Sequence, residues 1–362
     1  MLMPRPSSSL AVAAVLLLAG LAEAPQLAAQ RGAASSPSAG LGFAAKKPVM
    51  AAACKVCPWG AAGEVVKRAL QPYGYDVQIC YHCWQATNPR LVAGAGMPPP
   101  MAVPAYIPRA QVPPPPNGPV DFGVTSVQNV WNAYHGRGAF ASDGPRANLR
   151  LIATIQAPSY LIVAAKTSLG LTDLRQLKEK RWPVRLLTGS GNVEGILSYY
   201  GLSRPAIESA GGRVANGNSP DERKDFDVVI ANGSLGNAPE YNVWYEVSQR
   251  HDLTYLQLPD DLLDELAQDP TVERGSIPNG LLRGIDHPIA TVVRTGIAVY
   301  SRADAPEEFT YVAAKALDEH QGLLQWAHLN FSYNVHTVWK ALDLPLHPGA
   351  ARYYRERRYV PD

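Results

Sequence analysis

The chain has 362 residues, of which 46% are hydrophobic, and its formal net charge is +2. This length favours two lobes or domains, and the apolar fraction is sufficient for a sizeable core. A net charge so close to zero gives no global field that would point to nucleic acid or a membrane surface as a partner.

The N-terminal residues have the pattern of an export signal. Arg5 precedes the apolar run Leu10–Leu18, which is too short to span a bilayer, and small residues follow it. We therefore expect a signal peptide over residues 1–29, with its cleavage point open, and a flexible lead-in over residues 30–45. The mature protein is expected in the periplasm and not to span a membrane.

Two C-x-x-C motifs, Cys54–Cys57 and Cys80–Cys83, contain all the cysteines of the chain. Each motif follows an apolar, strand-like run, and Gly63–Leu70 between them has the spacing of an amphipathic helix. The pattern predicts a β-α-β unit, so both motifs should leave one edge of a parallel sheet, where ligands bind in open α/β sheets. At least one cysteine of each motif should then approach the other motif.

Three states of these cysteines are open. Exported thiols tend to pair as structural disulfides, which requires no cofactor. Four thiolates at this separation also resemble the ligands of a zinc ribbon, so Zn is the alternative cofactor. A reactive dithiol is the third state.

Proline marks a surface insertion. Residues 97–119 contain Pro98–Pro100 and Pro113–Pro116, and such a stretch continues neither a helix nor a sheet. We expect an extended segment that leaves the first lobe and rejoins it.

Strand and helix patterns alternate after the insertion, which predicts an α/β protein with mostly parallel sheets. The strand patterns are Asp121–Val127, Leu149–Ile155, Tyr160–Ala165, Val184–Leu187, Phe226–Ala231, Leu253–Leu258 and Ile289–Tyr300. The last pattern is interpreted as one long strand that returns to the first lobe. We therefore expect lobe 1 over residues 46–148, lobe 2 over 149–288, and the return to lobe 1 with C-terminal helices over 289–362.

The best candidate for a ligand loop is Thr188–Asn192. It follows the strand Val184–Leu187 and precedes a helix pattern over Val193–Tyr200. A glycine turn at a helix N-terminus presents backbone N–H groups and the positive end of the helix dipole, which favours a carboxylate or phosphate. An ordinary glycine-rich turn would have the same pattern.

The chain resembles the TAXI family of solute-binding proteins from TRAP transporters in several stretches. They are Asp121-Phe-Gly-Val-Thr-Ser-Val-Gln128, the Gly-Ser-Gly loop, Phe226-Asp-Val-Val-Ile-Ala-Asn232 and, most specifically, the closing Leu346-His-Pro-Gly-Ala-Ala-Arg-Tyr-Tyr354. The resemblance covers Lys46 to the C-terminus apart from the insertion. It implies a type II periplasmic-binding-protein-like fold, with two α/β lobes around a ligand cleft. It also implies capture of a small carboxylate or amino acid for a TRAP-type membrane permease.

The resemblance further implies a set of ligand-binding residues at strand ends. They are Ser126, Gln128, Gly189, Ser190, Gly191, Asn192, Asn232 and Ser234. The first loop departs from the family, because Cys54-Lys-Val-Cys-Pro-Trp-Gly60 stands where a glycine-rich stretch is usual. Trp59 is the candidate aromatic wall in that loop.

No catalytic set is evident, so we do not expect an enzyme. His82 and His135 lie near strand ends, and His287 lies in a loop, but none has an obvious nucleophile and acid beside it in the pattern. His347 of the closing stretch is expected to fix a turn. A periplasmic solute receptor is the main hypothesis, and a periplasmic redox or metal-handling protein that uses the C-x-x-C motifs is the alternative.

Overall fold

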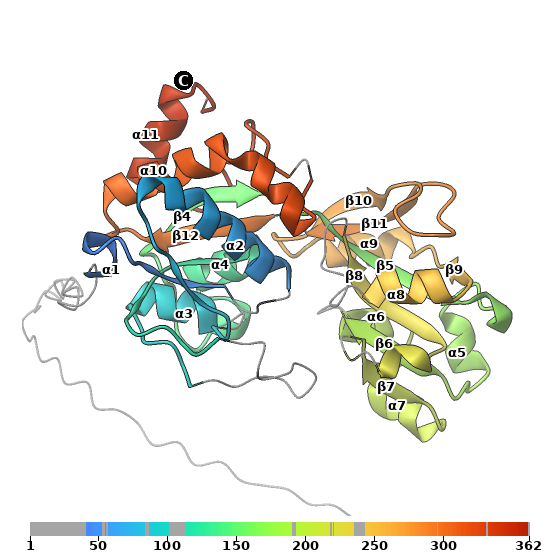
Figure 1. Ribbon diagram of the computed structural model, residues 1–362. Coiled ribbons are helices and arrows are strands. Elements are labelled where there is room, and N and C mark those ends of the chain that lie inside the picture. Colours follow the sequence, from blue (N-terminus) through green and yellow to red (C-terminus); the bar gives the residue numbers. More distant parts are fainter. Residues whose placement is uncertain are drawn as a thin grey trace, which may run out of the picture. The chain divides into compact units, whose positions relative to one another are not determined.

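The computed structural model describes residues 41–52, 55, 57–83, 87–100, 113–189, 193–217, 219, 221–234, 243–294, 296–330 and 332–360. The expected signal peptide, most of the lead-in, Cys54, and the loop residues Ser190, Gly191 and Asn192 lie outside these ranges. Within them the chain forms two β-sheets, each with its own helices (Figure 1). No helix in the described ranges combines the length and the apolar character needed to cross a membrane.

The first sheet is mixed and has the strand order β2-β1-β3-β12-β4. Its strands are β1 (Val49–Ala51), β2 (Gln78–Cys80), β3 (Val120–Ser126), β4 (Leu149–Ile155) and β12 (Ile297–Arg302). The strands β1, β2 and β3 are parallel, and β12 runs antiparallel between β3 and β4. The expected β-α-β unit is confirmed, since α2 (Pro58–Leu70) joins β1 to β2.

The second sheet is also mixed and has the order β10-β11-β5-β8-β6-β7, with β9 paired to β5. Its strands are β5 (Ser159–Lys166), β6 (Arg185–Gly189), β7 (Arg213–Asn216), β8 (Val228–Gly233), β9 (Leu253–Tyr255), β10 (Glu273–Ile277) and β11 (Ile289–Arg294). The strand β6 is parallel to β7 and β8, whereas β5 is antiparallel to its neighbours β8, β9 and β11.

The helices divide between the two sheets (Figure 1). Those with the first sheet are α1 (Leu41–Ala44), α2, α3 (Thr87–Gly94), α4 (Val127–His135), α10 (Glu307–Glu319) and α11 (Pro348–Glu356). Those with the second sheet are α5 (Arg175–Glu179), α6 (Val193–Tyr199), α7 (Arg204–Ser209), α8 (Val243–Arg250) and α9 (Asp260–Leu266). Short 3-10 helices include η1 (Gln71–Tyr73), η3 (Gly138–Phe140), η4 (Thr167–Leu169), η5 (Glu222–Lys224) and η7 (Gln321–Ala327).

Both faces of each sheet are buried. In β1, Met50 belongs to the core cluster that contains Phe309 of α10, while Val49 and Ala51 belong to the cluster that contains Val130 of α4. This alternation follows from the two-residue period of a strand. Strands covered on both faces need near-continuous apolar runs, which is why these segments were recognisable in the sequence. The expected α/β class, with two sheets and flanking helices, is confirmed. The expectation of mostly parallel sheets is wrong, because β12 in the first sheet and β5 and β11 in the second run antiparallel to their neighbours.

The structure corrects two strand assignments. Leu149–Ile155 was assigned to lobe 2, whereas β4 lies in the first sheet and pairs with β12. Ile289–Tyr300 was interpreted as one strand, whereas β11 belongs to the second sheet and β12 to the first. Gly296 separates them, because its φ of 86° ends the extended run. The sequence interrupts the apolar pattern here with Arg294-Thr295-Gly296, but such a break does not show that the strands on either side belong to different sheets.

The end of the expected lead-in is also structured. Leu41–Ala44 forms α1, and the ring of Phe43 is buried with its centroid 4.5 Å from that of Phe309. The composition of the lead-in did not indicate this, because one aromatic residue gives no periodicity.

The proline-rich insertion starts and ends at one place beside the first sheet. The backbone N–H of Val120 donates to the carbonyl of Gly96, with 2.9 Å between the two atoms. The segment therefore leaves after α3 and rejoins the first sheet at β3, so both of its ends lie in the first lobe, as expected. Residues 101–112 lie outside the described ranges.

The closing stretch fastens the C-terminal helix to the first sheet. His347 caps α11, since its Nδ1 accepts from the N–H of Gly349 at 3.3 Å and lies 2.7 Å from Oγ1 of Thr310. The hydroxyl of Tyr354 donates to the carbonyl of Ile152 in β4 at 3.1 Å. The expectation that His347 fixes a turn is confirmed.

Candidate functional site

The carboxyl ends of β3 and β4 lie at one edge of the first sheet. Ser126 at the end of β3 pairs with Ile297, and Ile297 also pairs with Ile155 at the end of β4. In open α/β sheets, ligands bind outside the carboxyl ends of the strands. We call this side, which also holds the ends of the parallel strands β1 and β2, the first carboxyl edge. Gln128 and Gln156 follow just beyond it.

The second carboxyl edge is formed by the ends of β6 and β8. These strands are parallel, and Gly189 pairs with Ala231. Gly189 is exposed, and Asn232 and Ser234 are half-buried at the end of β8. The three residues that the resemblance assigned to these two strand ends are therefore neighbours at one edge.

The chain passes between the two sheets twice among the described strands, and both passages join the two carboxyl edges. Residues 156–158 connect β4 to β5, and residues 295–296 connect β11 to β12. Arg294 at the end of β11 pairs with Ser159 at the start of β5. Three Cα–Cα steps span at most about 11 Å, so Arg294 cannot lie farther than that from Ile297. Chain connectivity therefore keeps these edges close to one another.

Ser126 and Gln128 are both engaged by the protein itself. Ser126 is the N-cap of α4, and its Oγ accepts from the N–H of Asn129 at 3.2 Å. The side-chain amide of Gln128 donates to Oδ2 of Asp269, 3.2 Å away. The Ser126 hydroxyl keeps its proton for a ligand, whereas Gln128 would have to exchange a bond. Their roles in ligand binding stay predictions.

Trp59 lies in the first turn of α2, after the end of β1. It is half-buried, and its side chain packs against the core cluster of the α2 and α10 face. It is therefore placed at the first carboxyl edge, and its role as an aromatic wall stays a prediction.

The anion loop itself lies outside the described ranges. Gly189 ends β6 and Val193 begins α6, so the expected strand precedes the loop and the expected helix follows it. The roles of Ser190, Gly191 and Asn192 in ligand binding stay predictions.

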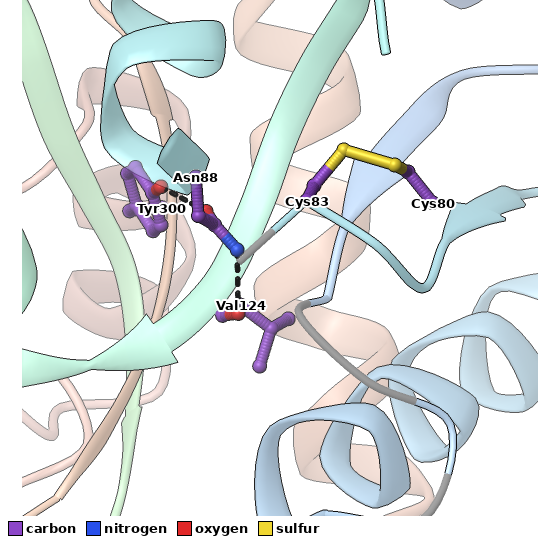
Figure 2. Close-up of a disulfide and its surroundings, with 5 residues drawn as sticks. All are labelled: Cys80, Cys83, Asn88, Val124 and Tyr300. Carbon is purple, nitrogen blue, oxygen red and sulfur yellow. Dashed lines mark hydrogen bonds between the residues drawn. A yellow bond between two sulfur atoms is a disulfide. The ribbon is translucent and has the colours of Figure 1, made fainter. Parts of the chain in front are cut away.

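The C-x-x-C motifs follow neighbouring strand ends, as expected. Ala51 pairs with Cys80, and the N–H of Ala52 donates to the carbonyl of Cys80 at 3.1 Å. Cys80 and Cys83 form a disulfide with each other, with Cα atoms 5.6 Å apart (Figure 2). Cys57 is also disulfide-bonded. No disulfide therefore joins Cys57 to Cys80 or Cys83, because each sulfur takes one such partner. The expected approach between the two motifs stays a prediction.

A zinc site made of four thiolates would need the sulfurs in their reduced form. In the part of the chain that the structure describes, no group of three or more His, Cys, Asp or Glu side chains is arranged to hold a metal ion. The zinc alternative stays a prediction, and it applies to the reduced protein.

A buried polar pair fixes the chain next to the disulfide (Figure 2). The side-chain amide of Asn88 in α3 donates to the carbonyl of Val124 at 3.1 Å, and its carbonyl accepts from the hydroxyl of Tyr300 in β12. A Cβ added at Gly123 would lie 2.7 Å from the Asn88 carbonyl oxygen, so only glycine leaves room here. The helix that follows the disulfide is thereby tied to two strands of the first sheet.

His82 was noted in the sequence only as a histidine near a strand end. In the structure it is 2% exposed, and neither ring nitrogen has a hydrogen-bond partner. Burial lowers the pKa of its imidazole, which is therefore neutral at pH 7. The available sequence signal was its place between Cys80 and Cys83 at the end of a predicted strand.

Gln156 is a second residue that the sequence did not single out. It begins the first passage between the sheets, its N–H donates to the carbonyl of Ser332 at 2.8 Å, and its side-chain carbonyl is 3.5 Å from the amide of Asn334. The assignment of β4 to lobe 2 concealed it, because that assignment placed no sheet change at this position.

One comparison with known proteins shows the family of this chain, and the solved structures give only distant similarity. A model of the NMT1-like family matches residues 116–357, which is more than half of the chain. Among solved structures, the periplasmic binding protein BugD has a TM-score of 0.42 and 10% sequence identity, with 87% of this chain and 94% of that chain covered. A periplasmic transporter structure has a TM-score of 0.39 and 12% identity, with 86% and 92% covered.

A third solved structure is the glycine betaine/L-proline-binding protein ProX of an ABC transporter from Borrelia burgdorferi. It has a TM-score of 0.38 and 12% identity, with 85% of this chain and 99% of that chain covered. All three TM-scores are below 0.5, so we draw nothing from them about the ligand or the arrangement of this chain.

Proposed function

This chain belongs to the NMT1-like family, and from that premise we propose that it is a periplasmic solute-binding receptor. It captures a small carboxylate or amino acid and delivers it to a membrane permease of the TRAP type. The resemblance of four stretches of the sequence to TAXI solute-binding proteins supports the transporter type, and the export pattern of residues 1–29 supports the compartment.

The observation that carries this proposal is the link between the two carboxyl edges. Both passages of the chain between the sheets start and end at these edges, and one of them is only two residues long. A ligand held at one edge is therefore within reach of polar groups from the other. A receptor that captures and releases a small solute needs a site with polar groups from two sheets that short connections keep together.

The ligand chemistry follows from the second edge. Ser190, Gly191 and Asn192 lie in sequence between β6 and α6, and we expect them to offer backbone N–H groups and the Ser190 hydroxyl to an anion. Asn232 and Ser234 end the neighbouring strand β8 and add neutral hydrogen-bonding groups. Neutral donors at this edge favour a carboxylate over a cation. Trp59, Ser126 and Gln128 would complete the site from the first edge.

The proposed receptor is not an enzyme. The polar side chains assigned to the proposed site are those of serine, asparagine and glutamine, which bind and orient a solute but do not supply an acid, a base and a nucleophile together. Affinity and release, not turnover, are then the quantities to measure.

The test is calorimetric titration with a panel of the twenty amino acids and the three- to six-carbon dicarboxylates. We expect one panel member to bind the wild type and to bind Ser190→Ala about tenfold more weakly or worse, because a charge-assisted hydrogen bond contributes about 1.5–3 kcal/mol. Ser209→Ala is the matched control, since the Ser209 hydroxyl bonds only to its own helix carbonyl at Ala206, 2.9 Å away.

Two results would contradict the proposal. If a neutral ligand without a carboxylate binds best, the anion site is wrong. If Ser190→Ala and Ser209→Ala bind the best panel member as tightly as the wild type, the loop is not part of the site.

A redox or metal-handling function is the second candidate, and the Cys80–Cys83 disulfide at the first carboxyl edge favours keeping it. Native mass spectrometry of the exported protein, with and without a reductant and added zinc, separates the two. A readily reduced pair, or zinc bound by the reduced protein at equal stoichiometry, supports the second function. Disulfides that resist reduction together with a bound carboxylate support the receptor.

A further inference from the structure

The disulfide between Cys80 and Cys83 closes the turn that ends β2. Contacts within the protein fix the side chains of Cys80, Tyr81 and Cys83. Both sulfur-bearing side chains are buried in the core cluster on the α3 and α4 face. Tyr81 packs in the cluster on the opposite face, and its hydroxyl donates to the carboxylate of Glu64 in α2. Only the imidazole of His82 is left to account for in this turn.

His82 is buried without any polar contact. Its side chain is 2% exposed, and neither Nδ1 nor Nε2 has a hydrogen-bond partner. A neutral imidazole offers one N–H donor and one acceptor, and leaving both unpaired in a protein interior destabilises the fold. The unpaired imidazole lowers the stability of the folded protein, which indicates a role for His82 other than folding.

The position of His82 indicates what that is. It lies two residues beyond the end of β2, and β2 is parallel to β1, which is parallel to β3. The backbone of His82 therefore follows a strand end at the first carboxyl edge, the side of the sheet on which Trp59 and Ser126 also lie. A bound solute is the partner expected at this edge of an α/β sheet.

We propose that His82 contacts the bound solute, donating a hydrogen bond from its imidazole to a carboxylate oxygen, and that the disulfide-closed turn holds the ring in place for this contact. The inference rests on the proposed receptor function and gives the first edge a contact residue that neither the resemblance nor the comparisons assign. A backbone closed by a disulfide has little freedom to lose on binding, so the contact is preorganised.

A structural role and a contact role predict opposite effects of one substitution. His82→Leu removes an unpaired polar group from the interior and keeps a side chain of similar size. If His82 contacts the solute, this variant should unfold at the same temperature as the wild type or higher, and it should bind the solute more weakly. If His82 serves the fold, the variant should unfold at a lower temperature.

The experiment measures both quantities for the wild type, His82→Leu and the control Tyr81→Phe, with the amino-acid and dicarboxylate panel at pH 7. Tyr81 lies in the same turn, but its hydroxyl already bonds within the protein. We expect the best panel member to bind His82→Leu about tenfold more weakly or worse, and Tyr81→Phe like the wild type.

The remaining outcomes overturn the inference. Equal binding by wild type and His82→Leu rejects the contact while the receptor function stands. Loss of binding together with a lower unfolding temperature in His82→Leu assigns His82 to the fold. A wild type that binds no panel member rejects the carboxylate receptor itself, and with it the contact that rests on it.

Discussion

The hydroxyl of Tyr300 donates a hydrogen bond to the side-chain carbonyl of Asn88, 212 positions earlier in the chain. Both residues are fully buried, and Asn88 also holds the carbonyl of Val124 in β3. The side-chain amide of Asn88 therefore joins α3 to β12. This strand belongs to the first sheet, although it follows all the strands of the second sheet in the sequence.

We expect Tyr300→Phe to lower the free energy of unfolding by about 1–3 kcal/mol, because it leaves the Asn88 carbonyl buried and unpaired. Urea denaturation measures this. Tyr311→Phe is the control, since its hydroxyl bonds to Glu356 at an exposed position and its loss should change stability by less than about 0.5 kcal/mol. Equal effects of the two substitutions would show that the buried pair adds nothing.

Gly296→Ala should destabilise the protein by about 1 kcal/mol or more. Gly296 has a φ of 86°, which side chains adopt with strain, and the added Cβ would lie 2.9 Å from Cγ2 of Thr154. Gly170→Ala is the matched control, because Gly170 also has a positive φ, 62°, but a Cβ there meets no atom within 4 Å. Thermal unfolding should rank Gly296→Ala clearly below Gly170→Ala, and the reverse order would contradict the argument.

Asp121 makes stability depend on pH. Burial raises the pKa of this carboxyl to about 6, while a hydrogen bond from the backbone of Val49 and the charge of Arg302 act against the rise. The folded state then keeps the proton to a higher pH than the unfolded state. Its contribution is therefore most favourable below about pH 4, and about 3 kcal/mol of it is lost as the pH rises to about 6.

Asp121→Asn checks this dependence. The amide keeps an oxygen for the Val49 N–H, which lies 2.8 Å from the carboxylate in the wild type, and does not titrate. Urea denaturation of both proteins at pH 4, 5, 6 and 7 should show the wild type losing stability relative to Asp121→Asn across this range. A constant difference between them would mean that Asp121 has the same pKa folded and unfolded.

Removing the disulfide should cost about 2 kcal/mol, the loop-entropy value for a closed loop of four residues. The double variant Cys80→Ala/Cys83→Ala measures this in urea without a reductant, so the disulfide bond of Cys57 stays intact. A loss below about 0.5 kcal/mol would indicate that the turn is equally ordered without the bond.

The α/β class and most strand positions were predictable from the sequence, because buried strands are continuous apolar runs. The assignment of strands to sheets was not predictable at Leu149–Ile155 and Ile289–Tyr300. Apolar periodicity shows that a strand is buried, not which sheet buries it, and the break at Arg294-Thr295-Gly296 does not show that the next strand joins another sheet. Register and long-range pairing decide that question, and neither leaves a local signal.

The candidate site shows the same division. The family resemblance assigned Ser126, Gly189, Asn232 and Ser234 to strand ends, and the structure places them at the ends of β3, β6 and β8. The bond from Gln128 to Asp269 and the unpaired ring of His82 could not be anticipated, since both depend on contacts between distant segments. The cysteines were predictable in place but not in partner, because neighbouring strand ends allow either pairing.

The hydrogen bond between Val120 and Gly96 has a consequence for engineering. Because this bond holds the two ends of the proline-rich segment together, a longer insert between them should change mainly the length of the loop. The closure entropy of such a loop grows by only about 0.6 kcal/mol for each doubling of its length. Positions inside this segment are therefore suited to receive a foreign domain, such as a fluorescent reporter, and a protein carrying one there should retain its own fold.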